Sequence, residues 1–178
     1  MIETKRLMLR PFKREDFGDV FEYLHKPAMN CFMDMKFETV EDAKAEVERR
    51  CKEDGCLYLA ICLKDSGKVI GEIFTPPEGD TFSPCWMINT EYQKQGYGFE
   101  AAYAFIDFLF SEKGARRVYA YTEDNNISCQ KLCEKLGMRK EGLFVEFVSF
   151  VNDENGAPIF ENTYQYAILK KEWLKNKG

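Results

Sequence analysis

One loop has residue types and spacing suited to binding a ligand. In the segment 93–98 two glycines, Gly96 and Gly98, stand just ahead of an apolar helix pattern. Glycine has no Cβ, so a ligand can approach its backbone amide closely, and the first N–H groups of a helix have no partner within that helix. The helix dipole adds about 0.3–1 kcal/mol for an anion at this end. The loop therefore predicts a phosphate site.

Two other interpretations of the same glycines must be weighed. The pattern Gly96-x-Gly98-x-x-Ala101 also fits the GxGxxA fingerprint of a dinucleotide-binding oxidoreductase, and Glu123 stands where its ribose-binding acid would be expected. In that fold, however, the strand runs apolar almost to the first glycine, whereas here seven mostly polar residues, 89–95, come before it. A purely structural glycine turn is the other alternative, and we give neither much weight.

Composition limits the classes of protein to consider. A chain of 178 residues fits one domain, 1–178, and can bury about 70% of its unfolded surface. Seven scattered cysteines without a CxxC pair, one histidine and an opening without a signal-like apolar run predict a reduced, cytoplasmic protein with no metal site. No apolar stretch is long enough for a membrane span. A net charge of −5 gives no general attraction to nucleic acid.

The elements that must position the loop follow from hydrophobic spacing and turn signals. The order is a strand, two helices, three strands, a helix, a strand, a helix and two strands, which predicts a mixed α/β sheet. Thr39 and Asp42 have the spacing of a helix N-cap. The predicted strands are 6–11, 57–63, 68–74, 83–89, 117–122, 138–151 and 159–169, and the predicted helices are 15–25, 39 toward Gly55, 99–110 and 127–136.

Four motifs together resemble one family. The arrangement Gln93-x-x-Gly96-x-Gly98 resembles motif A of the GNAT superfamily, the acetyl-coenzyme A-dependent N-acetyltransferases. The opening ETKRLMLRPFKREDF and the segments INTEYQKQGYGFEA, NISCQKLCEKLGMRKEG and YQYAILKKEW resemble the ribosomal-protein N-terminal (RimJ/RimL) acetyltransferase type, in the same order. The resemblance implies a GNAT fold, with a mostly antiparallel sheet flanked by helices.

The resemblance also implies where acetyl-coenzyme A would bind. The strand before the loop should carry a bulge and splay from its neighbour, so that the pantetheine arm pairs with its edge. A backbone N–H of that edge would stabilise the oxyanion of a tetrahedral intermediate, and the loop amides would hold the pyrophosphate. The implied cofactor-binding residues are Met87, Ile88 and Asn89 at the edge, Gln93, Lys94, Gln95, Gly96, Tyr97, Gly98 and Phe99 in the loop, and Asn126.

Two cysteines depart from the family pattern. Cys129 stands where this group usually has serine, and Cys133 stands where many GNAT enzymes have the tyrosine that protonates the coenzyme A thiolate. A thiol with an ordinary pKa of about 8.5 can act as a general acid, but a buried helical cysteine more often only packs. Asn126 precedes their helix, where capping alone could explain it.

The amine must be neutral before it attacks, so a general base is a further candidate. Glu72 and Glu146 are carboxylates within apolar strand patterns and could each relay a proton through water, or could simply face solvent. The implied mechanism is direct attack in a ternary complex without an acyl-enzyme, in which proximity supplies much of the acceleration.

The acceptor is not specified by these motifs. A protein N-terminus, a polyamine or aminoglycoside, and an amino-acid-like metabolite all fit an acidic protein. A coenzyme A-binding module without catalysis is a different class of answer, suggested by the missing serine and tyrosine. The two long C-terminal strand patterns could also pair across a homodimer.

Overall fold

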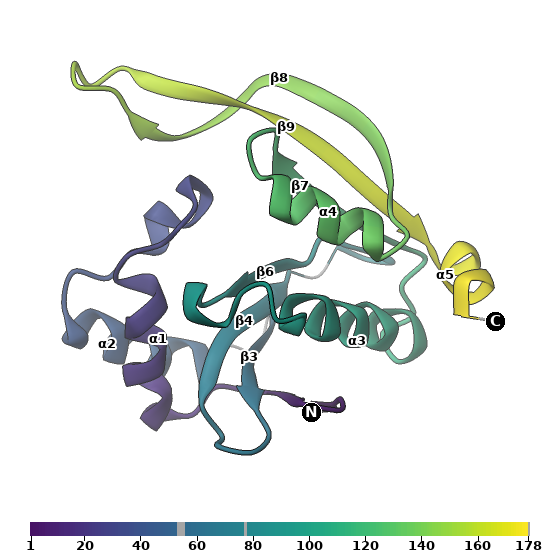
Figure 1. Cartoon of the computed structure of the whole chain (residues 1–178), viewed down its shortest axis with the longest axis horizontal. Helices are drawn as coiled ribbons and strands as arrows, with labels where there is room; N and C mark the ends of the chain where they lie inside the picture. The colour runs from purple at the N-terminus through teal and green to yellow at the C-terminus, as the bar shows by residue number, and fades with distance from the viewer. Residues whose placement is uncertain (53–55, 77, 178) are drawn as a thin grey trace.

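The computed structural model describes residues 1–52, 56–76 and 78–177, which form two sheets and their covering helices (Figure 1). The first sheet has five strands in the order β1-β2-β3-β4-β6, all paired antiparallel. These strands are β1 (Ile2–Glu3), β2 (Leu7–Arg10), β3 (Leu57–Leu63), β4 (Val69–Thr75) and β6 (Cys85–Ile88). The predicted hairpin of residues 57–63 with 68–74 is confirmed by the pairing of β3 with β4.

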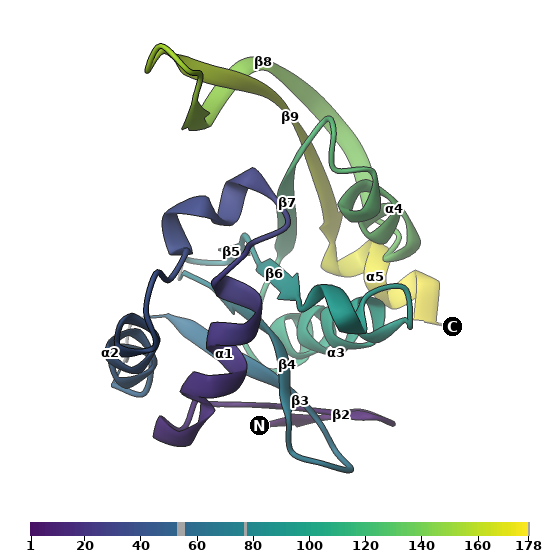
Figure 2. The same cartoon turned by 60° about the vertical axis from the view of Figure 1, so that its left-hand side comes forward.

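The second sheet has four strands in the order β5-β7-β9-β8. They are β5 (Thr81–Phe82), β7 (Arg117–Glu123), β9 (Pro158–Leu169) and β8 (Arg139–Asn152). Strands β8 and β9 form a long hairpin that extends beyond β7, and its far end lies over the segment between α1 and α2 (Figure 2). The mixed, mostly antiparallel fold class predicted from the sequence is confirmed.

The segment around the predicted strand 83–89 is divided between the two sheets. Strand β5 lies just before the predicted start and pairs in parallel with β7, whereas β6 lies within the predicted range and pairs antiparallel with β4. Pro84 lies between the two pieces, and proline has no N–H to donate to a ladder. The chain therefore leaves β7 at this point, and within the described residues no strand pairs with the outer edge of β6.

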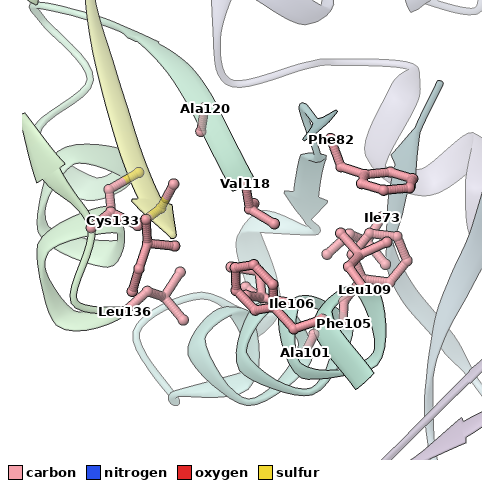
Figure 3. Packing of buried hydrophobic residues seen from close by; sticks show 14 of the residues in the cluster. Ile73, Phe82, Ala101, Phe105, Ile106, Leu109, Val118, Ala120, Cys133 and Leu136 are labelled. Carbon is pink, nitrogen blue, oxygen red and sulfur yellow. The ribbon is translucent and has the colours of Figure 1, made fainter. Parts of the chain in front are cut away.

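Helices cover both faces of the first sheet (Figure 1). On one face, Phe105, Ile106 and Leu109 of α3 share an apolar cluster with residues of both sheets, such as Ile73 of β4 and Val118 of β7 (Figure 3). Each such side chain contributes about 1.5–3 kcal/mol when fully buried. Helices α1 and α2 cover the other face through a second apolar cluster. The helices are α1 (Phe17–Leu24), α2 (Val40–Arg50), α3 (Tyr97–Ser111), α4 (Ile127–Lys135) and α5 (Lys170–Lys177), with short 3-10 turns η1 (Arg14–Asp16), η2 (Asn30–Met35) and η3 (Thr90–Tyr92).

Local signals placed most element ends well. Thr39 caps α2 as predicted, since its hydroxyl accepts from the Asp42 N–H at 3.2 Å and the Asp42 carboxylate accepts from the Thr39 N–H at 2.8 Å. Helix α2 ends at Arg50, before the predicted stop at Gly55, which lies outside the described residues. Strand β1, turn η2 and helix α5 were not among the predicted elements.

Candidate functional site

The glycine loop connects β6 to α3 through η3. Lys94 and Gly96 both have left-handed backbone conformations, with φ of 59° and 84°, and Gly96 is the N-cap of α3. A left-handed conformation is accessible to glycine without a steric penalty, which explains the glycine at position 96. The Gln93 side chain donates to the Ile88 carbonyl at 3.0 Å and ties the loop back to the end of β6.

The loop presents a continuous run of free backbone donors. The N–H of Gln93 donates to Thr90, and the N–H of Glu100 donates to Gly96. Between them, the N–H groups of residues 94–99 donate to no group in the described part of the chain. The last three of these belong to the first turn of α3, where the helix dipole adds positive potential. This is the arrangement expected of an anion site.

A contact from the start of the chain holds this loop in place. The Glu100 carboxylate accepts from the Thr4 hydroxyl at 2.6 Å and from the Arg6 Nε at 2.7 Å. Burial opposes ionisation of Glu100, but these hydrogen bonds lower its pKa. The Arg6 Nη1 also donates to the Gln95 carbonyl at 3.0 Å, and its guanidinium lies 4.2 Å from the centre of the Tyr97 ring. The opening motif ETKRL therefore holds the glycine loop in place, a role that no local signal in the sequence indicates.

Gly98 has no packing reason to be glycine. A Cβ at this position would lie 3.6 Å from the Ile88 Cγ1 and 3.9 Å from the Leu132 Cδ2, which are ordinary contact distances, and its φ is not left-handed. The protein itself would thus accept a side chain here. The absence of one keeps the helix N-terminus open to a ligand.

The three residues predicted at the edge of β6, Met87, Ile88 and Asn89, differ in the direction of their backbone N–H groups. The N–H of Asn89 donates to the Ile70 carbonyl at 2.8 Å, so it belongs to the ladder with β4 and does not face the free edge. Because successive residues of an antiparallel strand point their N–H groups to opposite sides, Met87 also faces β4 while Ile88 faces outward. Of the three, Ile88 alone presents its N–H at that edge.

Asn126 caps α4. Its side-chain oxygen accepts from the N–H of Cys129 at 3.1 Å, which confirms the capping role that the sequence allowed. No hydrogen bond of the described residues uses its side-chain NH₂ group, which leaves a donor available at the start of α4.

The two cysteines of α4 have different surroundings. Cys133 has no exposed surface and lies in the main core, as Figure 3 shows, whereas Cys129 is half-buried beside Thr122 and Trp86. The contact with the Cys129 thiol, together with burial, raises the pKa of Cys133, and the same contact lowers the pKa of Cys129. Cys133 therefore keeps its proton and could reach a ligand only through Cys129.

The two candidate bases lie in opposite environments. Glu72 has no exposed surface, and its oxygens accept from Tyr23 and Tyr58, each at 2.8 Å, and from Arg50. The alternative that Glu72 faces solvent is therefore wrong. Glu146 does face solvent, at an irregularity of β8 where its φ is 49°.

Comparison with known proteins decides the family. The family described as Acetyltransferase (GNAT) domain matches residues 6–139. The chain belongs to the GNAT acetyltransferase family. It is 34% identical to the uncharacterized N-acetyltransferase YnaD of Bacillus subtilis (strain 168) over 174 residues, which cover 97% of this chain and 98% of that relative.

Solved structures agree with this assignment of the fold. A GNAT-family acetyltransferase from Bacillus anthracis is 26% identical, with a TM-score of 0.83 over 96% of this chain and 98% of that one. A ribosomal-protein-S5-alanine acetyltransferase from Vibrio fischeri, at 20% identity, has a TM-score of 0.73 over 96% and 97%. The second likeness shows the fold alone. The antiparallel ladder of β6 with β4 and the family match leave the dinucleotide alternative without support.

One further carboxylate of the acetyltransferase, Glu123, had a predicted role only in the dinucleotide alternative. Glu123 ends β7 at 7% exposure and affects the pKa values of Cys31, Cys85 and Cys129, which come from η2, β6 and α4. Glu123 therefore lies within electrostatic range of all three elements. The only signal in the sequence was a charged residue closing an apolar strand.

A surface pocket borders the other side of the loop. It has a volume of about 560 Å³ and reaches from Gly96 along the outer face of α3 to Lys135, whose ammonium lies 4.3 Å from the centre of the Phe99 ring. Among the described residues, no helix is long and apolar enough to cross a membrane, and no three His, Cys, Asp or Glu side chains gather as metal ligands would.

Proposed function

We propose that this GNAT acetyltransferase transfers the acetyl group of acetyl-coenzyme A to a primary amine by direct attack within a ternary complex. The observation that carries the proposal is the run of unbonded N–H groups from residue 94 to 99, which continues from the free edge of β6. Backbone donors at a helix N-terminus suit a pyrophosphate, and an unpaired strand edge suits an amide-containing arm.

Each part of the site has a role in this proposal. The amides of residues 94–99 bind the pyrophosphate, with the exposed Lys94 ammonium nearby, and Asn126 binds the pantetheine arm through its free NH₂ group. The outward N–H of Ile88 faces the thioester and stabilises negative charge that develops on its carbonyl oxygen. Bound acetyl-coenzyme A supplies the activated acetyl group.

Cys129 is the residue we propose to stabilise the departing thiolate. It lies in the first turn of α4, directly after the Asn126 cap, and its thiol is half-buried near β6. The contact between the two thiols lowers the pKa of Cys129, and Cys133 has this effect from within the core. Replacing Cys129 with alanine should lower kcat with little change in coenzyme A affinity, and an unchanged kcat would remove it from the mechanism.

A pair of variants tests the phosphate site. Gly98→Asp places a carboxylate among the free amides, where it competes with phosphate and at the same time stabilises the helix. Gly98→Asn has nearly the same shape without the charge. By calorimetry, Asp should weaken coenzyme A binding at least about tenfold more than Asn, a difference of about 1.4 kcal/mol. Equal binding by the two variants would refute the phosphate role of the loop.

Thiol release from acetyl-coenzyme A with a panel of amines tests the activity itself. We expect acceptor-dependent release of coenzyme A with at least one primary amine. Tight binding of acetyl-coenzyme A without transfer to any amine would instead indicate a coenzyme A-binding module.

A further inference from the structure

The β9 strand carries a buried carboxylate, Glu161, that has no cationic partner among the described residues. Glu161 is 8% exposed, and its Oε1 accepts from the Asn30 side chain of η2 at 2.7 Å. Its Oε2 is buried and makes no hydrogen bond with the described residues. A buried carboxylate oxygen without a donor costs several kcal/mol, so a ligand that donates to it would be bound strongly.

Two further acceptor groups, those of Thr163 and Glu123, lie on the same face of the sheet as Glu161. Thr163 lies two residues along β9, on the same face as Glu161, and its hydroxyl is also buried without a partner. Glu123 of β7 is the register partner of Thr163, and its carboxylate makes no hydrogen bond or ion pair within the described chain. Register partners of an antiparallel pair share a face. Three acceptor groups therefore line one patch of the sheet, which η2 covers on one side.

The charge of this patch is uncompensated. None of the ion pairs of the described residues includes Glu123 or Glu161, whereas the buried acids Asp16 and Glu72 each pair with an arginine. A single ammonium group would leave one of the two carboxylates without a countercharge. Two ammonium groups would neutralise both.

The spacing suits two positive charges on one small molecule. Glu123 and Glu161 are diagonal neighbours across β7 and β9, a relation that separates residues by about 7–8 Å. Phe144 of β8 is the other register partner of Thr163, and its ring lies 5.0 Å from that of Phe147. These rings supply an apolar wall beside the carboxylates, which a methylene chain could contact.

Glu123 is the member of the pair closer to the transfer site. Asn126, the N-cap of α4, stands three residues after Glu123, and the negative charge of Glu123 acts to raise the pKa of both Cys85 and Cys129. Glu161 lies farther along the sheet, toward the hairpin that extends over η2 (Figure 1).

We propose that Glu123 and Glu161 form the acceptor subsite, and that the acceptor is a short aliphatic diamine or polyamine whose reacting nitrogen faces Glu123 while its second ammonium group binds Glu161 and Thr163. The inference rests on the proposed function for the identity of the reaction, and on the unpartnered buried oxygens for the identity of the acceptor.

Steady-state transfer to putrescine and to n-butylamine separates the second charge from the chain length. For the unmodified protein we expect a KM for putrescine at least about tenfold below that for n-butylamine, which corresponds to about 1.4 kcal/mol. Glu161→Gln keeps the shape and the bond from Asn30, so it should raise the KM for putrescine about tenfold, leave kcat within about twofold and leave n-butylamine unchanged.

Glu154→Gln is the matched control, because it removes the same charge from the exposed turn of the hairpin. A KM ratio that Glu161→Gln changes no more than Glu154→Gln does would overturn the proposal. So would a preference for a peptide N-terminus that is indifferent to Glu161. Thermal unfolding checks folding, and Glu161→Gln should not lower the Tm because it removes a buried charge.

Calorimetry with putrescine alone separates this inference from the proposed function. If no amine is acetylated but putrescine binds and Glu161→Gln weakens that binding, the cation subsite stands and the transferase activity does not. If amines are acetylated and putrescine binding does not depend on Glu161, the subsite falls and the activity stands.

Discussion

The buried network around Glu72 allows a decisive test of whether this residue supports the fold or the reaction. Glu72 has no exposed surface, and the Arg50 side chain is 1% exposed. Burial alone would lower the pKa of Arg50, but the neighbouring Glu72 carboxylate raises it. Removing the guanidinium by Arg50→Met leaves Glu72 with only the hydroxyls of Tyr23 and Tyr58.

The expected cost can be worked out from this geometry. Breaking a buried ion pair by removing one partner costs about 3–5 kcal/mol, out of a total free energy of unfolding of about 5–15 kcal/mol for a typical domain. Glu72→Gln should cost less, about 1.5–3 kcal/mol, because Arg50 keeps its bond to Glu46 at 2.8 Å. Arg49→Met is the matched control, since its side chain is 55% exposed and its pair with Glu46 should contribute at most about 1 kcal/mol.

Urea unfolding followed by tryptophan fluorescence measures these differences, because Trp173 is buried in the folded chain. The reasoning fails if Arg50→Met destabilises the chain no more than Arg49→Met. Activity provides the second measurement. If Glu72 is structural, the kcat of the folded Glu72→Gln variant stays within about twofold of the original, whereas a loss of about a hundredfold or more in a fully folded variant would identify Glu72 as part of a proton relay.

Three other predictions can be checked with similar assays. Gly71→Ala would place a Cβ 2.2 Å from the Met87 carbonyl oxygen, so β6 must shift. We expect the free energy of unfolding, measured with urea, to fall by about 1–3 kcal/mol and coenzyme A binding to weaken. Gly18→Ala is the control, because its Cβ would meet no atom within 4 Å, and it should show neither effect. Glu100→Gln removes the charge from the loop contact and should raise the KM for acetyl-coenzyme A severalfold at constant kcat; an unchanged KM would show that the contact does not position the loop. Burial and the Glu72 charge raise the pKa of Tyr58 above its ordinary 10.0, so the unfolded chain loses this proton first. Stability should therefore be complete below about pH 10 and fall as the pH rises above it, with a shallower fall in Tyr58→Phe, as urea midpoints across this range would show.

The parts of the fold that the sequence predicted are those with strong local causes. The Thr39 cap, the β3–β4 hairpin and the start of α3 after Gly96 each depend on residues within a few positions of one another. The division of residues 81–88 between two sheets was not predicted from the hydrophobic pattern, because that pattern continues across Pro84. Only the family resemblance implied it, through the expected splay.

The features of the candidate site also divide into those with local causes, which the sequence predicted, and those that depend on the tertiary fold, which it did not. The loop amides are a local property of a glycine-containing helix start, so the sequence was sufficient to find them. The environment of Glu72 was not predictable, since its partner Arg50 lies 22 residues away on a helix whose packing only the fold determines. Glu123 and Thr163 become neighbours through the register of β7 with β9, which no short motif encodes.

The charges on the two sides of the proposed transfer site have opposite signs, and this follows from the chemistry of the two substrates. On the donor side, neutral backbone amides and the dipole of α3 supply positive potential, so no buried cation has to be desolvated to bind a phosphate. On the acceptor side, Glu123 and Glu161 are buried without an ion pair to any described residue, so the field there favours an ammonium group and disfavours an anion. An acceptor that enters as a cation must lose a proton before it attacks, and a carboxylate beside its nitrogen both attracts the charged form and can receive that proton. The same residue that selects the acceptor by charge is therefore placed to prepare it for the reaction. Because Glu123 has both roles, Glu123→Gln should raise KM for the amine and lower kcat together. Glu161→Gln, which removes only the binding role, should raise KM alone.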